Sequence, residues 1–89
     1  MNDILTDFKT AYRDAVAKNY SYFAVKIHNA INNTDEVIIN SVSNMKNGKM
    51  TYYLNAYNDK LQLKHESRIY ISDFVYGNNF ESIRMAFKY

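Results

Sequence analysis

The sequence predicts an α+β fold in which an N-terminal helix packs on a five- to six-stranded antiparallel meander. Two observations favour it. An apolar stripe with helical spacing runs through residues 3–18, and a nearly unbroken alternation of polar and apolar residues runs from Lys60 to Asp73. Several short apolar segments are separated by turns rich in Asn and Asp, which is typical of strands with short connections. We expect one domain over residues 1–89, because this length supports a single modest core.

The first expected element is a helix from about Asp3 to Lys18. Asn2 or Asp3 can cap its start, and Lys18–Asn19 suits its end. Lys9 and Arg13 lie one turn apart away from the apolar stripe, and they form either a small basic patch or part of a solvated helix face. The residues of the apolar stripe are Ile4, Leu5, Phe8, Ala11, Tyr12, Ala15 and Val16.

Residues 20–31 fit two interpretations. As a strand, they place Phe23, Val25 and Ile27 on one face. As a helix, they also form an apolar stripe, which could continue the first helix. The aromatic start and the β-branched Val25 and Ile27 favour a strand.

The middle of the chain predicts two more strands. A turn at 32–35 precedes a strand over Glu36–Val42, whose centre is apolar. Asn47–Gly48 is a strong turn dipeptide, and we expect a third strand over Met50–Tyr57 to follow it. Asn58–Asp59 then reverses the chain, because both side chains tolerate left-handed conformations.

The alternating stretch itself predicts a strand with two different faces. Its odd positions carry Leu61, Leu63, Ile69 and Ile71, so we expect them to face the core. After a turn at 77–79, residues 80–88 alternate as a last strand. A C-terminal helix capped by Asn79 is the competing interpretation, since Phe80, Ile83 and Phe87 also sit at helical spacing.

Such a sheet either buries one face under the helix or curls into a small barrel. The order of one helix followed by five strands is similar in layout to Sm-like and other small SH3-like barrels. No motif of those families occurs in the sequence, so the similarity is one of layout only.

Composition and motifs argue against catalysis and cofactors. The chain has no cysteine and only two histidines, 37 positions apart, so we expect no metal site. Its two glycines, Gly48 and Gly77, each lie in an expected turn, and no phosphate-binding loop or serine nucleophile motif is present. No apolar run is long enough to span a membrane, and the lack of cysteine fits a cytoplasmic protein.

Binding is the function class that the pattern favours. The outward row of the alternating stretch mixes cations with an aromatic, and tyrosines on a neighbouring strand extend it. Such surfaces stack and neutralise single-stranded nucleic acid, while Tyr and Arg also dominate protein interfaces. Glu66 interrupts the row and the net charge is only +2, so a protein partner is the better expectation. The candidate contact residues are Lys60, Lys64, Arg68, Tyr70, Tyr52, Tyr53, Phe80 and Arg84.

The amino-acid composition suggests a source. Asn, Lys, Ile and Tyr supply 37 of the 89 residues, and all four have AT-rich codons. We therefore expect a phage or mobile-element accessory protein that binds and blocks a host protein, such as a defence nuclease, in the manner of anti-CRISPR proteins. The alternative is a nucleic-acid-binding small-barrel module. A homodimer is compatible with either function.

Overall fold

The computed structural model describes residues 3–87 and begins with the predicted helix, α1 (Ile4–Ala17). The Asp3 side chain caps it by accepting a hydrogen bond from the amide of Thr6 at 2.7 Å, and this bond lowers the pKa of Asp3. At the other end Asn19 has a φ of 58°, and the amides of Asn19 and Tyr20 donate to carbonyls of the last turn. This arrangement is a Schellman motif, so both predicted ends are confirmed to within a residue.

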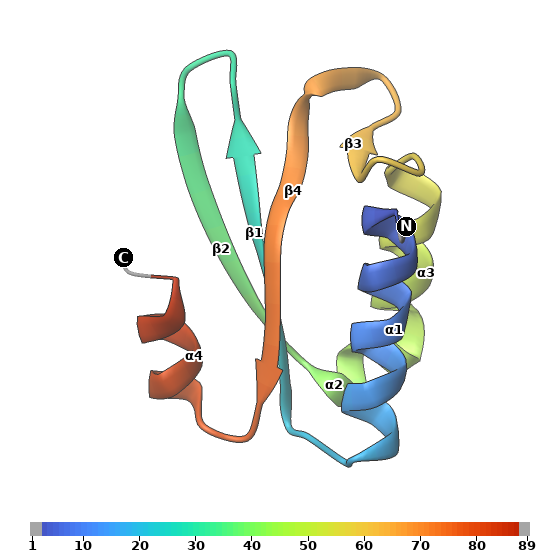
Figure 1. The fold of residues 1–89 in the computed structure, drawn as a ribbon, viewed down its shortest axis with the longest axis vertical. Helices are drawn as coiled ribbons and strands as arrows, with labels where there is room; N and C mark the ends of the chain where they lie inside the picture. The colour runs from blue at the N-terminus through green and yellow to red at the C-terminus, as the bar shows by residue number, and fades with distance from the viewer. Residues whose placement is uncertain (1–2, 88–89) are drawn as a thin grey trace.

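A four-stranded antiparallel sheet stands beside this helix, with strand order β2-β1-β4-β3 (Figure 1). The prediction of five or six strands is wrong, as is the meander, because the chain crosses from β2 at one edge to β3 at the other. The sheet stays open, so the barrel alternative is also wrong. The strands predicted within 20–31 and 36–42 are confirmed. The bounds are β1 (Tyr22–Asn29), β2 (Thr34–Ser41), β3 (Gln62–Leu63) and β4 (Glu66–Gly77).

Three short helical segments carry the chain from β2 to β3. Ser41 caps the first by accepting a hydrogen bond from the amide of Asn44 at 3.0 Å. The chain then kinks at Asn47 and Gly48, where Gly48 has a φ of 128°. The expected hairpin turn at Asn47–Gly48 is therefore a kink between helical segments. The segments are α2 (Val42–Asn44), η1 (Met45–Lys49) and α3 (Met50–Ala56).

The strand predicted over Met50–Tyr57 is wrong, because most of this segment is the helix α3. Met50, Tyr53 and Tyr57 recur at helical spacing, and all three are buried in the main core. The tyrosines favour a strand locally, but the packing of one helical stripe against α1 and the sheet outweighs that preference.

The alternating stretch of residues 60–73 is two strands rather than one. Lys64 and His65 form the turn between β3 and β4. Leu61 lies in the preceding turn with a φ of 56°, and the side chain of Asn58 holds that turn by accepting a hydrogen bond from the amide of Lys60 at 2.8 Å. The predicted reversal before the stretch is confirmed, and the second reversal inside it was not predicted.

A β-bulge changes which residues of β4 face the helices. Lys26 and Ile27 of β1 pair with Asp73 and Ile71, which leaves Ser72 as an extra residue in β4. The hydroxyl of Ser72 donates to the carbonyl of Lys26 at 3.2 Å. Odd positions face α1 before the bulge and even positions face it afterwards, so strict alternation ends there.

The C-terminal segment is the helix α4 (Phe80–Ala86), so the strand interpretation of 80–88 is wrong and the competing one is confirmed for the described residues. The side chain of Asn79 caps it by accepting a hydrogen bond from the amide of Ser82 at 3.0 Å. Residue 88 lies outside the described residues. In this segment Ile83 and Phe87 both pack against the sheet.

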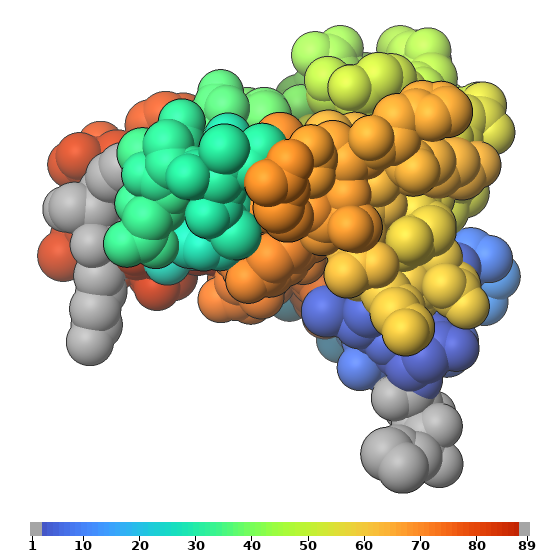
Figure 2. Space-filling view, turned by 90° about the horizontal axis from the view of Figure 1, so that it is seen from above, coloured from blue at the N-terminus to red at the C-terminus, as the bar shows by residue number. Residues whose placement is uncertain are grey.

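The sheet lies between two unequal helical layers (Figure 1). The helices α1 and α3 cover one face and form the main core, in which Phe8, Phe23 and Ile71 are buried. The helix α4 covers part of the other face, where Ile83 and Phe87 pack on Ala24. From above, the β1–β2 turn and the start of β4 lie side by side at the end of the sheet (Figure 2).

Candidate binding surfaces

The predicted contact residues lie on three separate surfaces. The first is formed by the turns and strands at one end of the sheet. The second lies on α3, in the larger helical layer. The third is α4 on the other face. Lys60, Lys64, Arg68 and Tyr70 lie at the sheet end, Tyr52 and Tyr53 lie on α3, and Phe80 and Arg84 lie on α4.

At the sheet end, Arg68 forms an ion pair with Glu66. Its Nε donates to Oε1 of Glu66 at 2.8 Å, and its Nη2 donates to Oε2 at 3.0 Å. This paired contact lowers the pKa of Glu66 and raises the pKa of Arg68. Arg68 is exposed and Glu66 is half-exposed, so the pair contributes little to stability, but it cancels the charge that Arg68 would offer to a phosphate.

Acidic and basic side chains also lie close together elsewhere on this face of the sheet. Tyr70 lies against the ring of His28, with 5.5 Å between ring centroids. His28 in turn contacts Asp35, with Nδ1 and Oδ1 3.0 Å apart. Lys26 stands opposite Asp73 in the strand register. The sheet face therefore mixes both signs of charge and is not a basic track.

On α3, the two neighbouring tyrosines have different environments. Tyr53 is 2% exposed, and its ring meets Phe8 edge-to-face at 6.0 Å, so it has no surface to offer a partner. Tyr52 is 52% exposed, and the Nζ of Lys49 lies 4.7 Å from its ring centroid. Of the two, Tyr52 remains available for contact.

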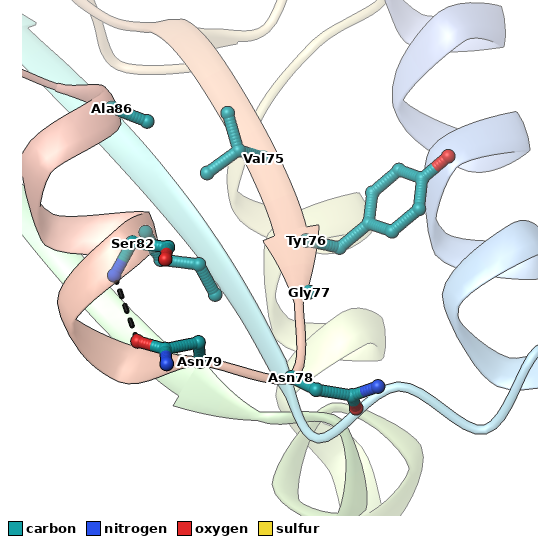
Figure 3. A pocket seen from close by; sticks show the side chains of 8 residues that line it. Val75, Tyr76, Gly77, Asn78, Asn79, Ser82 and Ala86 are labelled. Atoms are coloured by element: carbon teal, nitrogen blue, oxygen red, sulfur yellow. Dashed lines mark hydrogen bonds between the residues drawn. The ribbon is translucent and has the colours of Figure 1, made fainter.

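On α4, Phe80 is 46% exposed and meets Tyr22 edge-to-face at 5.8 Å, while Arg84 is bonded to Glu81 at 2.9 Å. A hollow of about 280 Å³ lies between α4 and the end of β4 (Figure 3). The ring of Tyr76 points away from this hollow towards α1, where its hydroxyl donates to Asp14 at 2.9 Å. The lining residues are Val75, Tyr76, Gly77, Asn78, Asn79, Ser82, Ile83 and Ala86, none of which is charged.

A second hollow, of about 270 Å³, lies between α1 and α3. Its lining residues are Lys9, Tyr12 and Arg13 from α1, and Met50 and Leu54 from α3, and we call it the α1–α3 hollow. Met50 is buried and Leu54 is half-buried, so the α3 side is apolar, while Lys9 and Arg13 bring positive charge to the α1 side.

Sequence reasoning found the two cations but not the hollow. Lys9 and Arg13 fall on one helical face, and that spacing is visible in the sequence. Met50 and Leu54 are also one helical turn apart, and their spacing was the available signal. It was missed because the segment was interpreted as a strand, which would place both side chains on the same face of the sheet and leave no helix beside α1.

The two cations of the α1–α3 hollow form no ion pair within the described chain, although the charge of Lys9 helps to lower the pKa of the nearby Asp3. Among residues 3–87, no acidic side chain lies within 4 Å of Lys9 or Arg13. Lys18 on the same helix behaves differently, with its Nζ 3.5 Å from Asp14. Lys9 and Arg13 therefore repel one another across one turn with no ion pair to offset the repulsion, at a cost of a few tenths of a kcal/mol.

Within residues 3–87, no three His, Asp or Glu side chains gather closely enough to hold a metal ion. Over the same range, no helix is both long enough and apolar enough to cross a membrane.

Comparisons with known proteins return no relative. No protein-family model matches the chain. No curated protein and no solved structure matches it significantly. Of the candidate surfaces, the α1–α3 hollow combines an apolar side with two cations that form no ion pair within residues 3–87.

Proposed function

We propose that this chain is a small non-catalytic protein that binds another protein and blocks it by covering a functional surface. The observation that carries the proposal is the α1–α3 hollow, where Lys9 and Arg13 form no ion pair within residues 3–87 and lie beside the apolar Met50 and Leu54. Apolar contact area bordered by charge is the composition of a protein-binding surface, in which the apolar part supplies affinity and the charges supply orientation.

A protein partner accounts for the charge distribution better than a nucleic acid does. Nucleic-acid binding needs several cations aligned along a backbone, and Arg68 and Arg84 are each bonded to a glutamate. The sheet face that could stack bases carries acids beside its cations. The charge arrangement therefore gives little support to nucleic-acid binding. The α1–α3 hollow gives more support to a protein interface.

The amino-acid composition supports a source and a role. The abundance of residues with AT-rich codons fits a phage or mobile element, and small proteins of such elements often inhibit host enzymes. We propose a host defence nuclease as the type of target and the host cytoplasm as the location. Blocking by coverage needs no cofactor, so the binding surface alone would account for the activity.

Affinity capture tests this function. The purified chain is immobilised and incubated with lysate from an AT-rich bacterial host, with and without nuclease treatment. We expect a host protein to be retained at a fixed stoichiometry after nuclease treatment and to lose its own activity when the chain is added. Failure to retain any protein, or retention that disappears with nuclease, would exclude the proposal.

A further inference from the structure

We infer that the α1–α3 hollow accepts an acidic amphipathic helix of the partner protein. One large apolar side chain of that helix enters between Met50 and Leu54, while two carboxylates face Lys9 and Arg13. The inference rests on the proposed function, and it names the chemistry of the partner at that same site.

The spacing of the two cations supports a helical occupant. Lys9 and Arg13 are four residues apart on α1, which corresponds to an axial rise of about 6 Å. Carboxylates at positions i and i+4 of a partner helix have the same rise, so both can meet their cations when the helices lie side by side. An apolar residue on that same face then lies over the hollow.

The open shape of the hollow favours a side chain over a small molecule, which would need to be enclosed. Pockets for drug-sized ligands have volumes of about 300–1,000 Å³ and enclose most of the ligand. The α1–α3 hollow is about 270 Å³, is open to solvent on its outer side, and has an apolar contribution from Met50 and Leu54. It therefore accommodates the tip of one apolar side chain whose backbone stays outside.

Charge favours an acidic partner, and the other flank of α1 limits how far the positive surface extends. Asp7 and Asp14 lie on the opposite flank of α1 from Lys9 and Arg13. A long polyanion laid across α1 would meet these acids, whereas a short acidic helix confined to the α1–α3 hollow would not. The cations therefore complement a local group of carboxylates.

Defined peptides test the inference directly. The main probe is a fluorescent 15-residue alanine-based helix with two glutamates one turn apart and a leucine on the same face. There are three comparison probes. In the first peptide both glutamates are replaced by lysine, and in the second the leucine is replaced by serine. The third probe is a 15-nucleotide single-stranded DNA. Binding is measured by fluorescence polarisation at low and physiological salt. We expect saturable binding of the glutamate–leucine helix alone, weakening as salt rises.

Matched charge reversals locate the contact. Lys9→Glu/Arg13→Glu should weaken binding of the main probe by about tenfold or more, because it replaces two attractions by two repulsions. Lys26→Glu/Lys46→Glu changes the net charge by the same amount on β1 and η1, outside the lining of the hollow, and should leave the affinity within about twofold. Lys9→Gln/Arg13→Gln, which removes charge without adding acids beside Asp3, gives an intermediate loss and covers the case in which the double reversal does not fold.

Three results would overturn the inference: no saturable binding of the main probe up to about 1 mM, equal losses from both charge reversals, or tighter binding of the DNA. The capture experiment separates this failure from a failure of the proposed function. A host protein retained equally by the wild type and by Lys9→Glu/Arg13→Glu would leave the function standing and place its surface elsewhere.

Discussion

The side-chain amide of Asn40 donates a hydrogen bond to the phenol oxygen of Tyr53, 3.2 Å away inside the protein. Asn40 is 9% exposed and is the one buried polar side chain among residues 3–87. The bond joins the edge strand β2 to α3, the helix that forms one side of the α1–α3 hollow. Burial raises the pKa of Tyr53, so its phenol stays protonated.

Removing the Tyr53 hydroxyl should lower stability, because it leaves the buried side-chain amide of Asn40 without a hydrogen-bond acceptor. We expect Tyr53→Phe to lower the free energy of unfolding by about 1–3 kcal/mol, measured by urea denaturation. Tyr53→Phe/Asn40→Leu removes both polar groups and should lose less than the sum of the two single variants. Additive losses in this cycle would show that the two side chains do not interact.

The two phenylalanines Phe8 and Phe80 should differ sharply in their importance for stability. Phe8 is fully buried and meets Phe23, Tyr53 and Phe74 edge-to-face, so Phe8→Ala should cost about 3–5 kcal/mol. Phe80 is a candidate contact residue and is 46% exposed, so Phe80→Ala should cost about 1 kcal/mol or less. Thermal unfolding of both variants checks the contrast, and similar losses would contradict the packing described here.

The fold was predictable where one local signal was strong. The cap at Asp3, the stripe of α1, and the β-branched Val25 and Ile27 each led to the correct element. The segment over Met50–Tyr57 was not predictable from local preference, because tyrosines favour strands and only tertiary packing selects the helix. The order of the strands depends on that helix, so a meander was predicted in place of the crossover.

The candidate binding surfaces were likewise predictable only where they depended on local sequence. Exposed charges such as Arg68 were placed on the correct face, but the sequence did not reveal that Glu66 binds it in a two-point contact. Predicting the α1–α3 hollow requires that both α1 and α3 be predicted as helices. With α3 predicted as a strand, Lys9 and Arg13 had no apolar neighbour and remained an ordinary pair of surface cations.

The kink inside η1 depends on a backbone conformation that favours glycine. Gly48 has a φ of 128°, and an added Cβ there would meet no atom within 4 Å, so the cost of Gly48→Ala is backbone strain alone. We expect a loss of about 1–2 kcal/mol. Gly77→Ala is the matched control, because the new Cβ would sit 3.8 Å from Ile83 in ordinary contact, and its effect should stay within about 0.5 kcal/mol. Equal effects in urea denaturation would contradict this account.

The bulge at Ser72 decides which half of β4 faces the main core. Deleting Ser72 would restore strict alternation and turn Phe74 and Tyr76 away from α1, so we expect loss of the cooperative unfolding transition. Ser72→Ala keeps the extra residue and loses only the exposed bond to Lys26, so it should cost about 1 kcal/mol or less. Circular dichroism during thermal unfolding distinguishes the two, and a deletion variant with wild-type stability would show that the bulge does not set the register.

Alkaline stability should depend on Tyr57. Burial raises the pKa of Tyr57 from its ordinary value of 10 to about 12. Below pH 10 the phenol is protonated in both the folded and the unfolded chain, so its contribution to stability is complete. As the pH rises from 10 to 12, the unfolded chain loses this proton while the folded protein retains it, and the free energy of unfolding falls by about 2–3 kcal/mol.

Tyr57→Phe isolates this contribution, because phenylalanine keeps the buried ring and removes the ionisable group. We expect the variant to match the wild type within about 0.5 kcal/mol between pH 7 and 9, and to lose less stability between pH 10 and 12. Part of the alkaline loss should remain, since the pKa values of Tyr53 and Tyr76 are also raised, by burial and by the hydrogen bond to Asp14 respectively. Urea denaturation across this pH range measures the difference. An unchanged slope in Tyr57→Phe would mean that the phenol of Tyr57 ionises as readily in the folded protein as in the unfolded chain.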